Sequence, residues 1–146
     1  MLCCISFFTC QAFSQTGNIA KKKFHDGKFN EQDTTAGYTE ALLAGNTLYI
    51  SGAVGKGTIA EQLQKIYTDL GKILKAYGAT FQNVVKENLY TTDIEAVKSN
   101  NAVRKEFYNG DFPAATWVQI TRLYSAKAQI EVELIAQLPA SVDNKK

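Results

Sequence analysis

The sequence lacks most of the residues on which metal, thiol and histidine chemistry depend. All three cysteines, Cys3, Cys4 and Cys10, lie within the first ten positions, and His25 is the only histidine. From residue 11 onward the chain therefore offers no disulfide framework, no cysteine nucleophile and no cysteine-histidine metal site, and no cofactor is expected. The net charge of +2 is too small to indicate a nucleic-acid surface, so the basic residues 21–23 are interpreted as a solvated arm.

The chain begins with a run that is largely apolar up to Phe13 and becomes small and polar at residues 14–18. The run is too short to cross a bilayer as a helix, and it resembles the apolar region and cleavage zone of a secretory signal. We therefore expect a signal peptide over residues 1–15, of the kind found in Gram-negative bacteria, and a periplasmic or secreted mature protein without membrane contact. The basic residues that usually precede such a run are absent, which leaves the start codon open, and lipidation of Cys10 is an alternative.

Hydrophobic patterning predicts one α+β domain over residues 37–138, between a polar arm at 16–36 and a tail at 139–146. β-prone runs predict strands, and apolar residues that recur every three or four positions predict helices. Thr58 and Glu61 have the spacing of a capping box at the start of the longer helix. The predicted order is ββαβαββ, with strands at 41–44, 47–51, 84–92, 116–123 and 129–138, a hairpin turn at Gly45-Asn46, and helices from Thr58 to Gly78 and from Asp93 to the residue before Asn109.

The last two predicted strands are expected to pair with each other, and each has two different faces. In the final strand Ile130, Val132 and Leu134 form an apolar face that the helices are expected to cover, and Glu131 and Glu133 lie opposite. A face exposed to solvent seldom keeps tryptophan, and a sealed core seldom accepts two glutamates without partners. We therefore expect a semi-polar face that is buried between subunits, shared by Trp117, Gln119, Thr121, Glu131 and Glu133.

Two segments, Phe112–Val118 and Gln129–Ala136, resemble the signature of the Rid (reactive intermediate deaminase) family. The resemblance extends from about Gly37 to Ala136. It implies a chorismate-mutase-like fold in which one mixed sheet carries two helices on one face. It also implies a homotrimer with small-molecule clefts between neighbouring subunits. Further matches follow in the family's order at Gly37-Tyr38, Leu48–Gly52, Val84–Lys86, Arg122-Leu123 and Ile130–Glu133.

The resemblance also implies roles for individual residues. Ala115 stands where imine-hydrolysing members have the arginine that binds the carboxylate of a 2-imino acid, and a methyl group cannot make that contact. Trp117 takes the place of a cysteine on the same side of the expected pocket. The remaining matches are Glu131, which orients the hydrolytic water, Tyr38, which closes over the substrate, Ser51 and Gly52 at a strand end near the cleft, and Asn101 in a supporting role.

Physical reasoning leaves other interpretations of these residues open. Ser51 is at least as well explained as a residue whose hydroxyl satisfies the backbone of a turn. Tyr38 and Trp117 are also explained as packing residues. Glu131 is the strongest candidate, because a carboxylate on a buried strand face needs partners or a raised pKa. Arg104 is expected to be an exposed helix arginine, with the alternative that it reaches the cleft.

These observations lead to one main hypothesis and two alternatives. The main hypothesis is a secreted homotrimer that hydrolyses a C=N bond in a substrate other than a standard 2-imino acid, with Glu131 activating water. The alternative is a non-catalytic small-molecule binder, so whether the chain is an enzyme stays open. An endoribonuclease is less favoured, because His25 lies in the arm and no basic-aromatic surface is evident.

Overall fold

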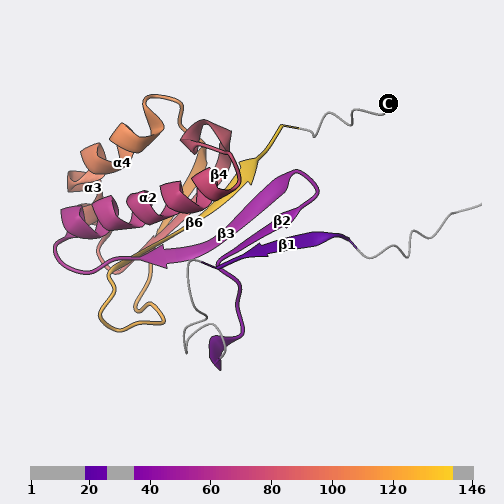
Figure 1. The fold of residues 1–146 in the computed structure, drawn as a ribbon. Coiled ribbons are helices and arrows are strands. Elements are labelled where there is room, and N and C mark those ends of the chain that lie inside the picture. Colours follow the sequence, from indigo (N-terminus) through magenta and orange to yellow (C-terminus); the bar gives the residue numbers. More distant parts are fainter. Residues whose placement is uncertain (1–18, 26–34, 140–146) are drawn as a thin grey trace, which may run out of the picture.

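The computed structural model of the chain describes residues 19–25 and 35–139 (Figure 1). The predicted signal peptide and most of the predicted tail lie outside these residues. The described part contains one six-stranded sheet with the strand order β1-β2-β3-β6-β4-β5. The strands are β1 (Lys21–Phe24), β2 (Ala41–Ala44), β3 (Thr47–Val54), β4 (Val84–Thr91), β5 (Ala114–Gln119) and β6 (Ile130–Gln137).

The labelled helices lie together on one face of the sheet (Figure 1). The longest, α2 (Ile59–Ala76), begins at the predicted capping box, in which the Glu61 carboxylate accepts a hydrogen bond from the Thr58 N–H at 2.8 Å. The other helical segments are η1 (Phe81–Asn83), α3 (Ile94–Ser99) and α4 (Asn101–Tyr108). The α+β class with helices on one face of a mixed sheet is therefore confirmed. No helix among the described residues has both the length and the apolar character that a membrane span requires.

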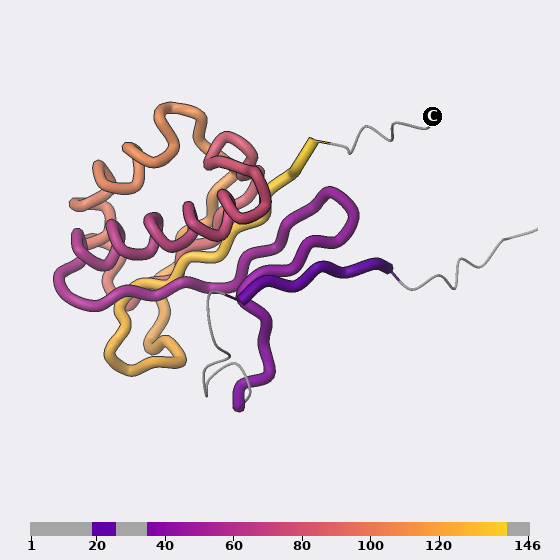
Figure 2. The backbone as a smooth tube through the Cα atoms, in the orientation of Figure 1, coloured from indigo at the N-terminus to yellow at the C-terminus, as the bar shows by residue number. Residues whose placement is uncertain are grey.

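The hydrophobic core lies between β6 and α2, at the centre of the molecule (Figure 2). Strand β6 pairs with β3 on one side and β4 on the other, and its predicted apolar face is fully buried. Burying each large aliphatic side chain of this core contributes roughly 1.5–3 kcal/mol to folding. The main contributors are Ile130, Val132 and Leu134 from β6 with Leu63, Ile66, Leu70 and Leu74 from α2.

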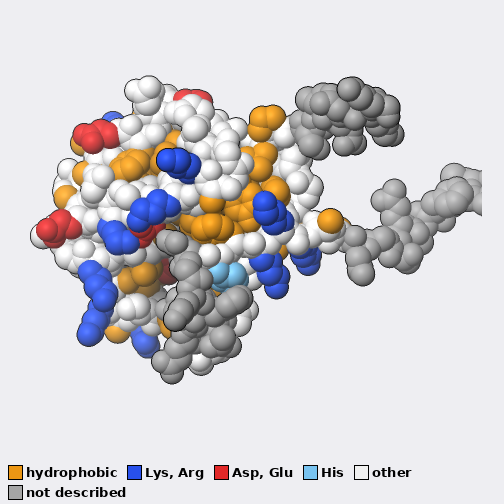
Figure 3. Space-filling model, in the orientation of Figure 1, with side chains coloured by type: hydrophobic (Ala, Val, Ile, Leu, Met, Phe, Trp, Pro, Cys, Tyr) orange, Lys and Arg blue, Asp and Glu red, His pale blue; other side chains and the backbone are white. Residues whose placement is uncertain are grey.

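Residues 21–23, interpreted as a solvated arm, form strand β1, and their three lysine side chains are exposed. Phe24 lies opposite Ala41 of β2, and the Tyr77 hydroxyl at the end of α2 donates to the Lys22 carbonyl oxygen at 3.1 Å. Backbone pairing and this helix contact override the low strand propensity of lysine. On the face shown in Figure 3, basic side chains border an apolar strip. The ring centroids of Phe24 and Tyr77 lie 6.1 Å apart.

Two further expectations are corrected at the C-terminal end of the sheet. Strand β5 covers Ala114–Gln119 instead of 116–123, and it pairs with β4 in parallel instead of pairing with β6. The reason is topological, since α3 and α4 carry the chain across one face from β4 and return it alongside β4, as in a βαβ unit. The predicted second helix is also divided at Asn100, whose side-chain Nδ2 donates to the Ala96 carbonyl oxygen at 2.8 Å.

Candidate functional site

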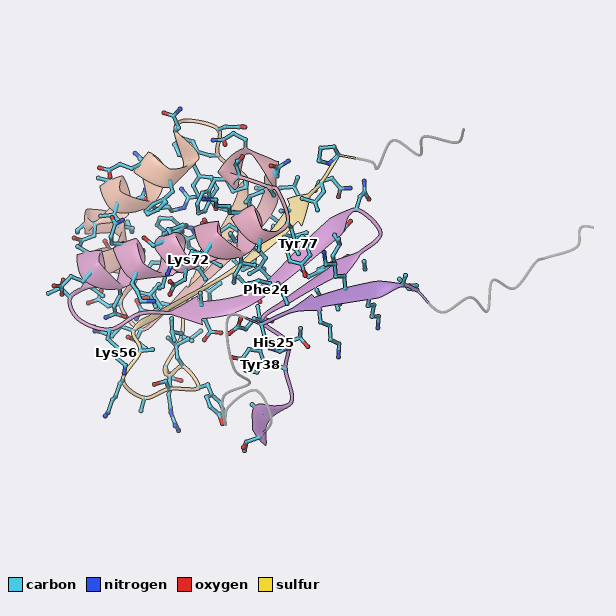
Figure 4. The ribbon with its side chains drawn as sticks, viewed as in Figure 1. Phe24, His25, Tyr38, Lys56, Lys72 and Tyr77 are labelled. Carbon is cyan, nitrogen blue, oxygen red and sulfur yellow. The ribbon has the colours of Figure 1, made fainter. Side chains whose placement is uncertain are left out.

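Glu131 lies in a cavity of about 390 Å³ at one end of the sheet. The cavity is formed where β3 and β6 pair, with Val54 opposite Glu131 in the register. Figure 4 shows Tyr38 on the segment that precedes β2. The structure therefore brings four of the predicted site residues together in one chain: Tyr38, Ser51, Gly52 and Glu131.

The backbone at Gly52 makes room for the Glu131 carboxylate. The register between β3 and β6 is irregular between Ile50 and Ala53, and this irregularity includes Ser51 and Gly52. A Cβ atom added at Gly52 would overlap Oε1 of Glu131. Any other residue at position 52 would therefore push the carboxylate aside, which is a physical reason for glycine at this position.

The surroundings of Glu131 raise its pKa. Burial is the larger cause and the negative charge of Glu133, two residues along the same face, is the second. Glu133 is itself held by hydrogen bonds from Asn88 Nδ2 at 2.7 Å and the Tyr90 hydroxyl at 3.2 Å. No hydrogen bond within the described residues reaches the Glu131 carboxylate, so its oxygens are available to a water molecule or a ligand.

Ser51 has a structural task in this arrangement. Its hydroxyl donates to the Thr39 carbonyl oxygen at 2.6 Å, and its N–H donates to the Glu40 carbonyl oxygen at 2.9 Å. Ser51 therefore fixes the segment that carries Tyr38, which agrees with the alternative that its hydroxyl satisfies the backbone.

A larger cavity of about 740 Å³ lies between the start of α2 and the loop before β6. It is lined by Lys56, Gly57 and Lys127, and Lys56 is labelled in Figure 4. None of the predicted site residues contributes to it. Its acidic lining residue, Glu61, is engaged in capping α2, so the smaller cavity is the candidate site.

The remaining predicted site residues form a second group on the other face of the sheet. Ala115 lies opposite Glu87 and Trp117 opposite Leu89, and both residues of β4 are fully buried under the helices. The expectation that Trp117 shares a face with Glu131 is therefore wrong. The alternation along β5 is as predicted, but pairing in parallel with β4 turns Val118, opposite Tyr90, to the Glu131 face.

Glu87 is the centre of a buried hydrogen-bond network that the sequence did not reveal. Its carboxylate is fully buried and accepts hydrogen bonds from Arg104 Nε at 2.8 Å and Trp117 Nε1 at 3.0 Å. The hydroxyls of Tyr67 and Tyr108 also donate to it, at 2.9 and 2.7 Å. Burial, followed by the charge of Glu87, raises the pKa of both tyrosines, which therefore stay protonated as donors.

The expectation that Arg104 is exposed on its helix is also wrong, since only 6% of the residue is accessible. Pairing with Glu87 explains its burial, because an arginine seldom enters a core without a carboxylate. A signal was present in the sequence: Glu87 alternates with Leu89 and Thr91 at inward positions of β4. An inward glutamate requires a cationic partner, and Arg104 is one of only two arginines in the chain.

Metal chemistry finds no support at either group. No cluster of three or more histidine, cysteine, aspartate or glutamate side chains that could hold a metal occurs in residues 19–25 and 35–139.

The mixed sheet with its helices on one face defines a protein of the chorismate-mutase-like class. The family model described as Endoribonuclease L-PSP matches residues 29–138, and the chain belongs to this family, the YjgF/Rid family. A solved YjgF-family structure from Mycobacterium tuberculosis superimposes with a TM-score of 0.75 at 25% identity, covering 82% of this chain and 100% of that one.

Relatives of this chain have names that refer to imine hydrolysis. It is 35% identical over 108 residues to 2-iminobutanoate/2-iminopropanoate deaminase of Bos taurus, a match that covers 68% of this chain and 78% of that protein. It is 33% identical to the human protein of the same name, with the same coverage. These names describe the relatives, whereas Ala115 and the Glu87 network are features of this chain.

Proposed function

We propose that this chain hydrolyses the C=N bond of an imine, with Glu131 as the general base. A water molecule that gives a proton to Glu131 adds its oxygen to the imine carbon. Addition converts the C=N bond into a C–N single bond, and Glu131 returns its proton to the nitrogen. The hydroxyl proton then moves to the nitrogen, the C–N bond breaks, and ammonia and a carbonyl compound form without an oxidant or reductant. The names of the relatives support this reaction class.

The observation that carries the proposal is the state of the Glu131 carboxylate. It lies against Gly52 in a cavity, its pKa is raised, and the described residues give it no hydrogen-bond donor. A partly desolvated carboxylate without a donor is a stronger base than a solvated one, and it remains able to bind water.

The proposal includes a homotrimer, because the two groups of predicted site residues lie on opposite faces of one chain. Only a neighbouring copy can bring the Ala115 and Trp117 group against the cavity of Glu131. Strand β5 supports such a contact, since it is an edge strand with no charged residue, and Phe112 beside it is 50% exposed. An uncharged edge of this kind favours pairing or burial, whereas β1 at the opposite edge carries three lysines.

We also propose that the protein acts outside the cytoplasm, from the apolar character of residues 1–13. Because Ala115 offers no cation, we propose a substrate other than a standard 2-imino acid. A non-catalytic binder with the same pocket is the second candidate, favoured by the exposed ring of Phe112 near the partly buried Trp117. Release of ammonia from a panel of freshly generated imines, in the presence of purified protein, decides between them.

Ala115→Arg is expected to increase hydrolysis of 2-iminobutanoate at least thirtyfold. A charge-assisted contact to the carboxylate is worth about 2–3 kcal/mol, and each 1.36 kcal/mol corresponds to tenfold in rate. Trp117 stands two residues along the same face, so the double variant with Trp117→Cys gives the new arginine more room. Initial rates of ammonia release measure the effect.

Ala114→Arg is the matched control, because Ala114 lies opposite Lys86 on the other face of β5 and should give no gain. Wild-type turnover of 2-iminobutanoate as fast as that of the deaminase relatives would contradict this prediction. It would show that an arginine at position 115 is dispensable.

Glu133→Gln is expected to shift the acid side of the pH–rate profile to lower pH. A general base acts when deprotonated, so activity falls as the pH drops through the pKa of Glu131. The negative charge of Glu133 disfavours ionisation of Glu131 and raises that pKa, so its removal lowers the pKa while burial still keeps it above the ordinary value. The exposed Glu106→Gln is the control and should leave the profile unchanged. An unchanged profile for Glu133→Gln would mean that another group limits the rate in acid.

A further inference from the structure

The end of the Arg104 side chain carries hydrogen-bond donors that no described residue accepts. Both of its hydrogen bonds run from Nε to Glu87, at 2.8 and 3.1 Å, and its terminal Nη groups make none within the described residues. The rings of Tyr108, Trp117 and Phe112 surround the guanidinium carbon, with centroids 4.8, 5.3 and 5.6 Å away. Arg104 is therefore enclosed, with 6% of the residue accessible, and its Nη edge has no partner among the described residues.

This edge belongs to the face of β5 on which Ala115 stands. Ala115 is the register partner of Glu87, whose carboxylate binds Arg104, and Trp117 on the same face contacts both Glu87 and Arg104. Because the side chain of Ala115 is a single methyl group, nothing longer at that position competes for the space. The guanidinium of Arg104 thus lies on the same face of the sheet as Ala115, beside Glu87 and Trp117.

The charge of this guanidinium is already compensated. Glu87 is fully buried and within hydrogen-bond distance of Arg104, so the pair presents no net charge to a ligand. An anionic ligand at the Nη groups would be attracted by Arg104 and repelled by Glu87 at only slightly greater distance. A neutral hydrogen-bond acceptor receives the same two donors without that repulsion.

Asn101 supplies the complementary group. It lies one helical turn before Arg104 on α4, and residues at this spacing share a helix face. Its side-chain Oδ1 is buried and has no hydrogen-bond partner. A buried acceptor without a donor is costly, and a ligand N–H group would satisfy it.

We infer that Arg104 and Asn101 recognise a carboxamide, whose carbonyl oxygen accepts from the Nη groups of Arg104 and whose N–H donates to Oδ1 of Asn101. A carboxylate has no proton to donate and bears the charge that Glu87 repels. This inference rests on the proposed function and deepens it, because it makes the substrate an imine next to a neutral amide. Water then converts R–C(=NH)–C(=O)NH₂ into R–C(=O)–C(=O)NH₂ and ammonia.

Fluorescence of the full-length protein tests this without any turnover, because Trp117 is the only tryptophan in the chain. Titrations with 2-oxobutanamide and 2-oxobutanoate compare a neutral and an anionic product analogue of the same size. We expect the amide to bind at least tenfold more tightly. Equal binding, or tighter binding of 2-oxobutanoate, would overturn the inference.

A paired substitution assigns the preference to Arg104. Glu87→Gln with Arg104→Met removes both charges together and avoids an unpaired buried ion. Calorimetric titration should show the affinity for 2-oxobutanamide reduced at least tenfold, whereas the exposed neighbour Lys105→Met should leave it unchanged. If the paired variant instead loses its assembly in light scattering and wild type shows no amide preference, Arg104 belongs to a subunit contact and the inference is wrong.

Asn101→Leu separates the two halves of the recognition. The methyl ester of 2-oxobutanoate offers a carbonyl oxygen but no N–H, so wild type should prefer the amide to the ester and Asn101→Leu should bind the two alike. Amide binding without ammonia release would contradict the proposed hydrolysis alone. Hydrolysis without amide preference would contradict this inference alone.

Discussion

Glu131→Gln is expected to lower the rate of imine hydrolysis by a factor of about 100 to 10,000, the usual contribution of a positioned general base. The amide keeps the size of the side chain against Gly52, so the cavity and the fold should be preserved. What disappears is a carboxylate with a raised pKa whose oxygens accept no hydrogen bond from the described residues. Initial rates of ammonia release at neutral pH measure the loss.

Two controls make this result specific to catalysis. Light scattering should give the same assembly for the variant and wild type, at about three times the mass of one chain if the trimer is correct. The affinity for 2-oxobutanamide should change far less than the turnover rate. The amide is recognised by Arg104 and Asn101, which lie with Ala115 and Trp117 and not in the cavity of Glu131. A variant that keeps most of the wild-type rate would remove Glu131 from the mechanism.

Local patterns in the sequence predicted the elements that depend on local chemistry. The capping box at Thr58, the apolar stripe of α2 and the alternation along β6 each follow from neighbours within a few residues, and the structure confirms all three. The position of β5 beside β4 instead of β6 depends on which strand the chain meets after crossing the sheet. That choice is made between residues far apart in sequence, so strand periodicity alone could not predict it.

The sequence predicted the surroundings of Glu131 in the candidate site, but not the positions of Trp117 and Arg104. A glutamate on a partly buried strand face indicated a raised pKa for Glu131, and the structure gives that direction and its cause. Assigning Trp117 to the same face failed because a strand's alternation specifies two faces without saying which is inward. Arg104 was misplaced because its burial depends on Glu87, seventeen residues earlier, and neither residue indicates the pair by itself.

Glu87→Gln is expected to destabilise the protein by about 3–5 kcal/mol, because it leaves the guanidinium of Arg104 buried without its counter-charge. The glutamine also turns an N–H₂ group toward some of the donors that now share the carboxylate, so several of them lose an acceptor. Denaturant-induced unfolding, followed by circular dichroism, measures the change in free energy. The exposed pair of Glu95 and Lys98 is the control, since Glu95→Gln should cost less than about 1 kcal/mol.

Removing the partner as well should recover part of that loss. In Glu87→Gln with Arg104→Met no buried charge remains, and a methionine of similar length can pack among Tyr108, Phe112 and Trp117. The paired variant should therefore be more stable than Glu87→Gln alone, and the double-mutant cycle should give a coupling above about 1 kcal/mol. Additive losses would mean that Glu87 and Arg104 act independently. Charge compensation would then no longer explain why a carboxylate is disfavoured beside Ala115.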